Sequence, residues 1–124
     1  MRRSFPLLLV LLLATPAFAG RELASLPVEM RGTWDISYQS CRVDGSDSRV
    51  TVESRDVTMG TTRYESDHIM PLSDGVRIDA ITHEQGSQDS GRGSIEMKLI
   101  DATRLSVKTD FVGDTYVNCK DATQ

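Results

Sequence analysis

The amino-acid sequence predicts an all-β fold, a small antiparallel up-and-down β-barrel of seven or eight strands with a short N-terminal helical turn. Two observations favour an antiparallel β fold. Apolar and polar residues alternate along several short segments, which is the period of a strand with one buried face. Turn-forming residues separate these segments at intervals of about 8 to 12 residues. The sequence lacks the long helical periodicity that the crossover connections of a parallel sheet need.

The first elements of the domain are predicted as a helical turn followed by a strand. Residues 20–30 are rich in apolar side chains, and Pro27 is of the type that favours the start of a helix. Alternation then begins and continues from Gly32 to Ser40, which predicts a half-buried strand. Its apolar face carries Trp34, Ile36 and Tyr38.

The later strands follow at regular intervals. Residues 43–48 predict a turn, and alternation resumes over 49–54 and continues to Gly60. Residues 84–93 predict a loop, because glycines stand there among polar residues, and residues 113–114 predict a turn. The remaining predicted strands are 62–70, 76–81, 94–99, a short one around Leu105 and Val107, and 116–120.

The start of the chain predicts a cleavable secretory signal peptide over residues 1–19. Arg2 and Arg3 precede an apolar run over 7–14, and residues 17–19 form a small-x-small cleavage site. An uncleaved anchor is the alternative. We therefore expect one domain over residues 20–124, periplasmic or secreted, with no membrane anchor after cleavage.

Export makes a disulfide the favoured interpretation of the two cysteines. Cys41 ends the first predicted strand and Cys119 lies in the last, so a bond between them would join neighbouring strands of a barrel. This placement favours a barrel over a sandwich, which is the alternative fold. A loop of this length is worth about 4 to 5 kcal/mol in the chain-entropy model. Metal ligation is the alternative role, although structural zinc normally takes four ligands.

The charge of the chain excludes some partners. Without residues 1–19, which hold two arginines and no acidic residue, 12 basic and 18 acidic residues remain, a formal charge of −6. Nucleic acids and anionic membranes are bound through basic patches, so neither is expected as a partner. A basic partner would be attracted.

The sequence offers no motif for catalysis, a cofactor or a metal, so we expect a protein that is not an enzyme. No serine stands in a nucleophile elbow, and residues 86–93 lack the ending of a phosphate loop. His68 and His83 each have an acidic neighbour, but no spacing defines a metal site, and surface histidines are favoured. Residues 44–47 lack the ordered spacing of a calcium loop.

Aromatic residues are few, and they are expected in the core because each removes a large apolar area from water. An apolar lining for a ligand cavity is the alternative, although a barrel filled by side chains is favoured. The predicted core residues are Trp34, Ile36, Tyr38, Tyr64, Phe111 and Tyr116.

Two short motifs resemble those of known barrels. Gly32-Thr33-Trp34 resembles the Gly-x-Trp opening of lipocalin-type barrels, and Thr109-Asp110-Phe111 followed by Tyr116 resembles their Thr-Asp-Tyr segment and later tyrosine. The chain is shorter than a typical lipocalin and lacks a counterpart of the family's late arginine. Length, export signal and a cysteine soon after Trp34 look closer to small periplasmic barrels, including metalloprotease inhibitors of the Inh type. Those inhibitors carry both cysteines near the N-terminus, unlike this chain.

This resemblance implies an exported, non-enzymatic binding protein, inhibitor-like toward a protein partner in the cell envelope. Its contact surface would be built from loops 43–48, 84–93 and 110–115, or from the N-terminal segment over residues 20–30. The alternative function is a carrier of a small hydrophobic ligand in a lipocalin-like barrel.

Overall fold

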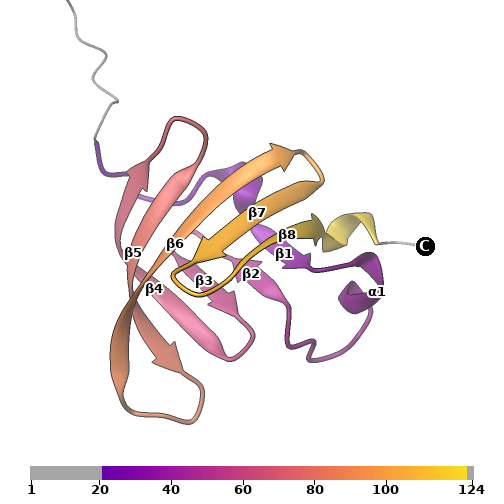
Figure 1. The fold of residues 1–124 in the computed structure, drawn as a ribbon, viewed down its shortest axis with the longest axis horizontal. Helices are drawn as coiled ribbons and strands as arrows, with labels where there is room; N and C mark the ends of the chain where they lie inside the picture. Colours follow the sequence, from indigo (N-terminus) through magenta and orange to yellow (C-terminus); the bar gives the residue numbers. More distant parts are fainter. Residues whose placement is uncertain (1–20, 123–124) are drawn as a thin grey trace, which may run out of the picture.

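The structure is a computed structural model that describes residues 21–122, and its strands form a closed antiparallel barrel (Figure 1). Each strand pairs with the next along the chain, and β8 returns to pair with β1. The predicted up-and-down β-barrel is therefore confirmed. The predicted signal peptide, residues 1–19, lies outside the described residues. The strands are β1 (Gly32–Asp35), β2 (Val50–Val52), β3 (Asp56–Met59), β4 (Thr62–Pro71), β5 (Val76–Glu84), β6 (Ser90–Asp101), β7 (Arg104–Thr109) and β8 (Gly113–Asn118).

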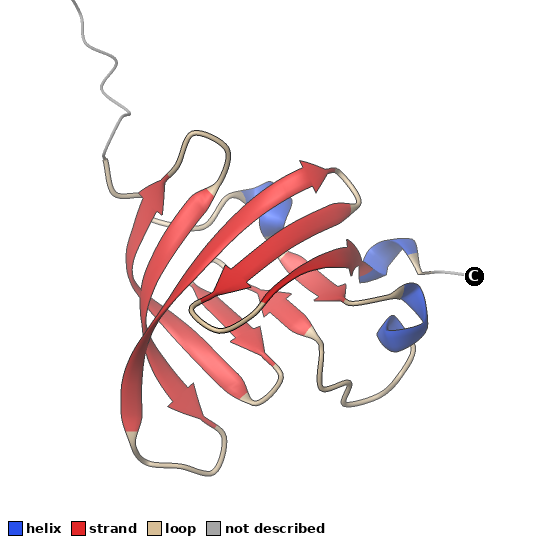
Figure 2. Cartoon of the chain, in the orientation of Figure 1, coloured by secondary structure: helices blue, strands red, loops and turns tan. Residues whose placement is uncertain are grey.

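Helical structure is confined to short pieces at the periphery of the barrel (Figure 2). The predicted N-terminal turn is η1 (Val28–Met30), and it directly follows Pro27. The other pieces are α1 (Tyr38–Cys41) and η2 (Cys119–Asp121). No helix within residues 21–122 is long and apolar enough to span a membrane.

The first strand is shorter than predicted, and this corrects two core assignments. β1 ends at Asp35 because Ser37 caps α1: its Oγ accepts a hydrogen bond from the Ser40 N–H at 3.1 Å. Such local side-chain bonding competes with strand pairing. Ile36 and Tyr38 consequently leave the barrel wall and are 42% and 39% exposed, so both were wrongly predicted as core residues.

The strands on either side of the β5–β6 turn are longer than predicted. Pairing continues out to His83 and Ser90, so half of the predicted loop 84–93 is strand and only residues 85–89 form the turn. Gly93 lies within β6, opposite Ala80 of β5, and a Cβ at this position would stand only 3.0 Å from the ring of Tyr64. The glycine therefore makes room for an aromatic side chain that reaches across from β4.

The β7–β8 turn comes three residues earlier than predicted, and this corrects a third core assignment. Residues 113–114 begin β8, and the turn is formed by 110–112. Thr109 Oγ1 accepts hydrogen bonds from the N–H groups of Phe111 and Val112 at 3.2 and 3.0 Å. Phe111 is thereby placed at the tip of the turn, where it is 94% exposed rather than in the core.

The barrel interior is filled by side chains. Trp34 is fully buried, and its indole N–H donates to the Met30 carbonyl at 2.9 Å. Tyr116 is also buried, and Tyr64 is half-buried and packs against the core. The other buried apolar residues are Leu26, Met30, Val50, Val52, Val57, Ile69, Val76, Ile78, Ala80, Ile95, Met97, Leu105 and Val107.

Candidate functional site

Residues 36–48, between β1 and β2, form a loop that we call the disulfide loop. Cys41 in this loop is bonded to Cys119, with a Cα–Cα distance of 5.4 Å, which confirms the predicted disulfide. The sequence predicted Cys41 at the end of the first strand and Cys119 in the last strand. The structure instead places the two cysteines in α1 and η2. The bond thus ties the disulfide loop to the chain just after β8.

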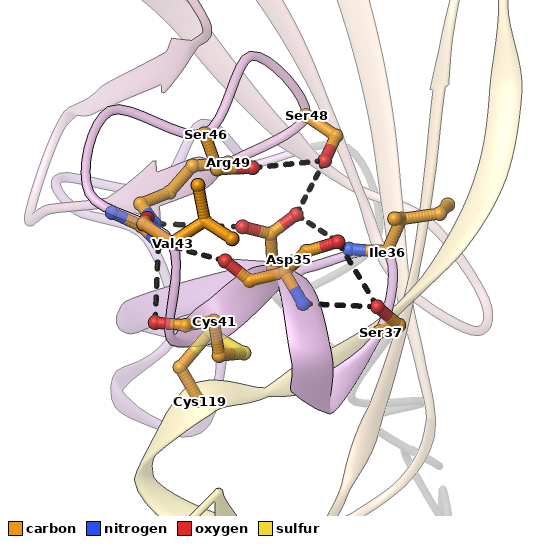
Figure 3. Close-up of polar contacts among 10 residues, drawn as sticks. Asp35, Ile36, Ser37, Cys41, Val43, Ser46, Ser48, Arg49 and Cys119 are labelled. Atoms are coloured by element: carbon orange, nitrogen blue, oxygen red, sulfur yellow. Dashed lines mark hydrogen bonds and ion pairs between the residues drawn. A yellow bond between two sulfur atoms is a disulfide. The ribbon is translucent and has the colours of Figure 1, made fainter.

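A buried carboxylate holds the base of this loop (Figure 3). Asp35 is fully buried, and its Oδ1 accepts hydrogen bonds from Ser48 Oγ at 2.5 Å and from the Ile36 N–H at 2.8 Å. Its Oδ2 lies 3.5 Å from Nε of Arg49. Burial by itself raises the pKa of Asp35, but these hydrogen bonds, Ser46 and the Arg49 charge together lower it below its ordinary value.

Arg49 links this carboxylate to the disulfide loop. Its Nη2 donates to the carbonyl oxygens of Ser40, Cys41 and Val43 at 3.1, 3.2 and 2.7 Å (Figure 3). Because the Asp35 side chain has no exposed surface, it cannot meet a substrate or partner. Asp35 therefore acts from inside the protein, by holding the disulfide loop in place.

The two histidines do not form a site together. His68 pairs with Asp79 in the β4–β5 ladder, whereas His83 lies four positions farther along β5. A hydrogen bond with Glu22 raises the pKa of His68 above its ordinary value. Among the residues that the structure describes, no group of three or more His, Cys, Asp or Glu side chains is placed to hold a metal ion.

The strongest candidate lies at the end of the barrel formed by turns 60–61, 85–89 and 110–112, which we call the barrel mouth. A cleft of about 290 Å³, the inner cleft, opens here. The predicted loops 84–93 and 110–115 meet in it, because both supply lining residues. Loop 43–48 reaches the same end, beside Thr61 and Gln85. The lining of the inner cleft is Thr62, Tyr64, Thr82, Glu84, Arg92, Gly93, Ser94, Thr109, Asp110 and Phe111.

The inner cleft is acidic. Glu84 accepts hydrogen bonds from the hydroxyls of Thr61 and Thr62. Burial, followed by the negative charges of Asp110 and Glu84, raises the pKa of Tyr64. Arg92, which also lines the cleft, donates to Asp67 at 2.7 Å. A ligand in this cleft would therefore meet hydroxyl and carboxylate oxygens under an exposed aromatic ring.

The N-terminal segment, residues 21–31, lies at the other end of the barrel (Figure 1). Its N–H groups at Leu23 and Leu26 donate to the carbonyl oxygens of Ile69 and Ser54, each at 2.7 Å. It thus does not join the loops of the barrel mouth, and the two predicted contact surfaces are separate.

Sequence reasoning missed two groups of residues. Asp35 stands at a polar position of the predicted strand, next to Trp34, and only the end of β1 places it under the disulfide loop. Glu84 and Asp110 are 26 positions apart, and only the strand register brings them to one cleft.

Comparison with protein families, with curated proteins and with solved structures finds no match for this chain. The lipocalin-like and Inh-type resemblance therefore stays a prediction, and function must be argued from the barrel mouth itself.

Proposed function

We propose that this chain is an exported, non-enzymatic binding protein that holds a protein partner at the barrel mouth in an inhibitor-like way. The observation that carries the proposal is Phe111, which is 94% exposed beside the inner cleft on a turn fixed by Thr109. Val112 next to it is 54% exposed. Exposed aromatic residues on rigid supports are typical of the residues that dominate binding energy at protein interfaces.

The framework behind this turn supports the proposal. A closed barrel and the Cys41–Cys119 disulfide present the loops with little freedom to lose on binding. Binding by a surface that is already ordered costs less conformational entropy. The disulfide also supports export, since such bonds persist in oxidising compartments.

The packed interior supports surface binding over the alternative function, carriage of a hydrophobic ligand. Small apolar ligands are held in pockets lined mainly by hydrophobic side chains. Here the barrel interior is occupied by core residues such as Ile78, Ile95 and Leu105, and the cleft at its mouth is lined largely by hydroxyl and carboxylate groups.

Site-specific photo-crosslinking in the native cell envelope tests the proposal. One variant carries the crosslinking side chain at Phe111, and the matched control carries it at Leu72, which is 40% exposed in the β4–β5 turn at the opposite end. We expect one discrete protein adduct from position 111 and none from position 72. Equal labelling from both positions, or no adduct from position 111, would contradict the proposal.

A further inference from the structure

The first step concerns β6, which extends beyond its neighbour β7. Residues 90–97 of β6 pair with β5, but pairing with β7 begins only at Ile95, opposite Thr109. The segment Ser90–Ser94, which we call the β6 overhang, therefore has a strand partner on one side only. In such a segment, alternate residues direct their N–H and C=O groups toward the open side, where another strand can pair with them.

The space beside the overhang is open on both faces of the sheet. The inner cleft lies on the mouth side, and a second cleft of about 240 Å³, the outer cleft, is lined by Arg77, Glu96 and Lys108. Ser94, Thr109 and Asp110 line both clefts, so the two meet at the point where β7 ends. A chain lying along the overhang would fill the position that β7 occupies farther along β6.

The charges on the two faces differ. Glu84 and Asp110 line the inner cleft. Lys108 lines the outer cleft and lies opposite Glu96 in the β6–β7 ladder. Arg92 is engaged by Asp67. An added strand would direct alternate side chains to each face, so its inward-facing positions would meet net negative charge.

We propose that an extended basic segment of the partner protein adds to the β6 overhang as a strand, with alternate Lys or Arg side chains over Glu84 and Asp110. This inference rests on the proposed function and names the chemistry of the partner. Backbone hydrogen bonds would supply affinity, and the alternate side chains would supply specificity, as in other cases of strand addition. Tyr64 and Phe111 in the same cleft offer aromatic faces to the inserted cations.

Hydrogen exchange measured by NMR tests strand addition directly. The probe is a blocked peptide, Lys-Val-Lys-Val-Lys-Val, added to the oxidised protein, with Glu-Val-Glu-Val-Glu-Val as its matched control. We expect the open-side amides of Ser90–Ser94 to exchange about tenfold more slowly with the basic peptide only. The basic peptide N-methylated at alternate residues should lose this effect, because it cannot donate to β6.

Two substitutions test the charge argument. Both Glu84 and Asp110 are exposed, so the double variant Glu84→Gln, Asp110→Asn should fold normally. We expect it to raise the Kd of the basic peptide about tenfold. Asp74→Asn, in the β4–β5 turn at the opposite end, is the matched control and should leave the Kd unchanged.

Several outcomes would overturn the inference. One is slower amide exchange at Gly113–Tyr116 rather than at the overhang. A second is equal binding of the N-methylated and the unmethylated basic peptides. A third is slower exchange at the overhang without peptide, caused by dimerisation. An adduct from position 111 without peptide binding would leave the proposed function standing and refute strand addition. Peptide binding without an adduct would support strand addition and refute the proposed partner contact.

Discussion

The two ends of the barrel differ in whether their apolar side chains and backbone N–H and C=O groups are covered. At the end opposite the mouth, which we call the closed end, Leu26 is fully buried and its N–H donates to the Ser54 carbonyl. Arg31 donates from Nε and Nη2 to the Leu26 carbonyl at 3.0 and 2.8 Å. At the barrel mouth, the overhang of β6 has no second strand and Phe111 is exposed.

Under the proposed function, this difference separates residues that stabilise the barrel from residues that bind. Within residues 21–31, Leu26 and Met30 are buried and Leu23 packs against the core, so these side chains cover the closed end. The barrel mouth keeps both its aromatic side chain and its backbone groups available. The N-terminal segment over residues 20–30 stays the alternative predicted contact surface, and its Val28 and Glu29 line a separate cleft of about 630 Å³.

The largest effect on this comparison is expected from Leu26→Ala. Removing a fully buried leucine should lower the free energy of unfolding by about 2–5 kcal/mol, because it leaves a cavity under the N-terminal segment. Urea denaturation measures this loss. Val28→Ala is the matched control: Val28 is 69% exposed, so the change should be within about 0.5 kcal/mol. Similar losses in both variants would show that the segment does not close the barrel.

A smaller effect is expected from Asp35, which holds the disulfide loop. Asp35→Asn should cost about 1–3 kcal/mol at neutral pH, because the buried network loses its negative charge and an amide NH2 replaces one carboxylate oxygen beside Arg49. The pKa of Asp35 is lowered in the folded protein, so its contribution is present above about pH 3.8, its ordinary value, and is lost as pH falls through the folded value.

Urea denaturation across this pH range measures the effect. The difference in stability between the wild type and Asp35→Asn should be constant well above pH 3.8 and shrink as the pH falls through 3.8 and then through the lower folded value. Asp44→Asn, an exposed change in the same loop, is the control and should leave the loss of stability at low pH unchanged. A difference that persists undiminished to low pH would mean that the Asp35 charge does not stabilise the loop.

The sequence predicted the barrel well because the signals for it are local. Alternation marks each strand and turn residues separate them, and Trp34 and Tyr116 are buried as expected of aromatic residues. The errors at Tyr38 and Phe111 are also local: a serine cap ends the first strand, and a threonine hydroxyl sets the last turn. Alternation alone cannot weigh these hydrogen bonds against strand pairing.

The candidate site was less predictable because it depends on strand register. The overhang exists because residues 90–94 of β6 extend past the end of β7. This stagger is a property of barrel closure rather than of either strand alone. Glu84 and Asp110 share a cleft for the same reason. A single sequence carries no direct signal for such a long-range offset.

The smallest effect on stability, and the sharpest test of the comparison, is expected from Phe111→Ser. Because the ring is 94% exposed, the free energy of unfolding should change by no more than about 0.5 kcal/mol. The partner captured by crosslinking should nevertheless bind about tenfold more weakly, since exposed aromatic anchors dominate interface energies. Isothermal titration calorimetry with the purified partner measures this, and Leu72→Ser at the closed end is the control. A large loss of stability in Phe111→Ser, or equal binding in the two variants, would erase the distinction between an end that closes the barrel and an end that binds.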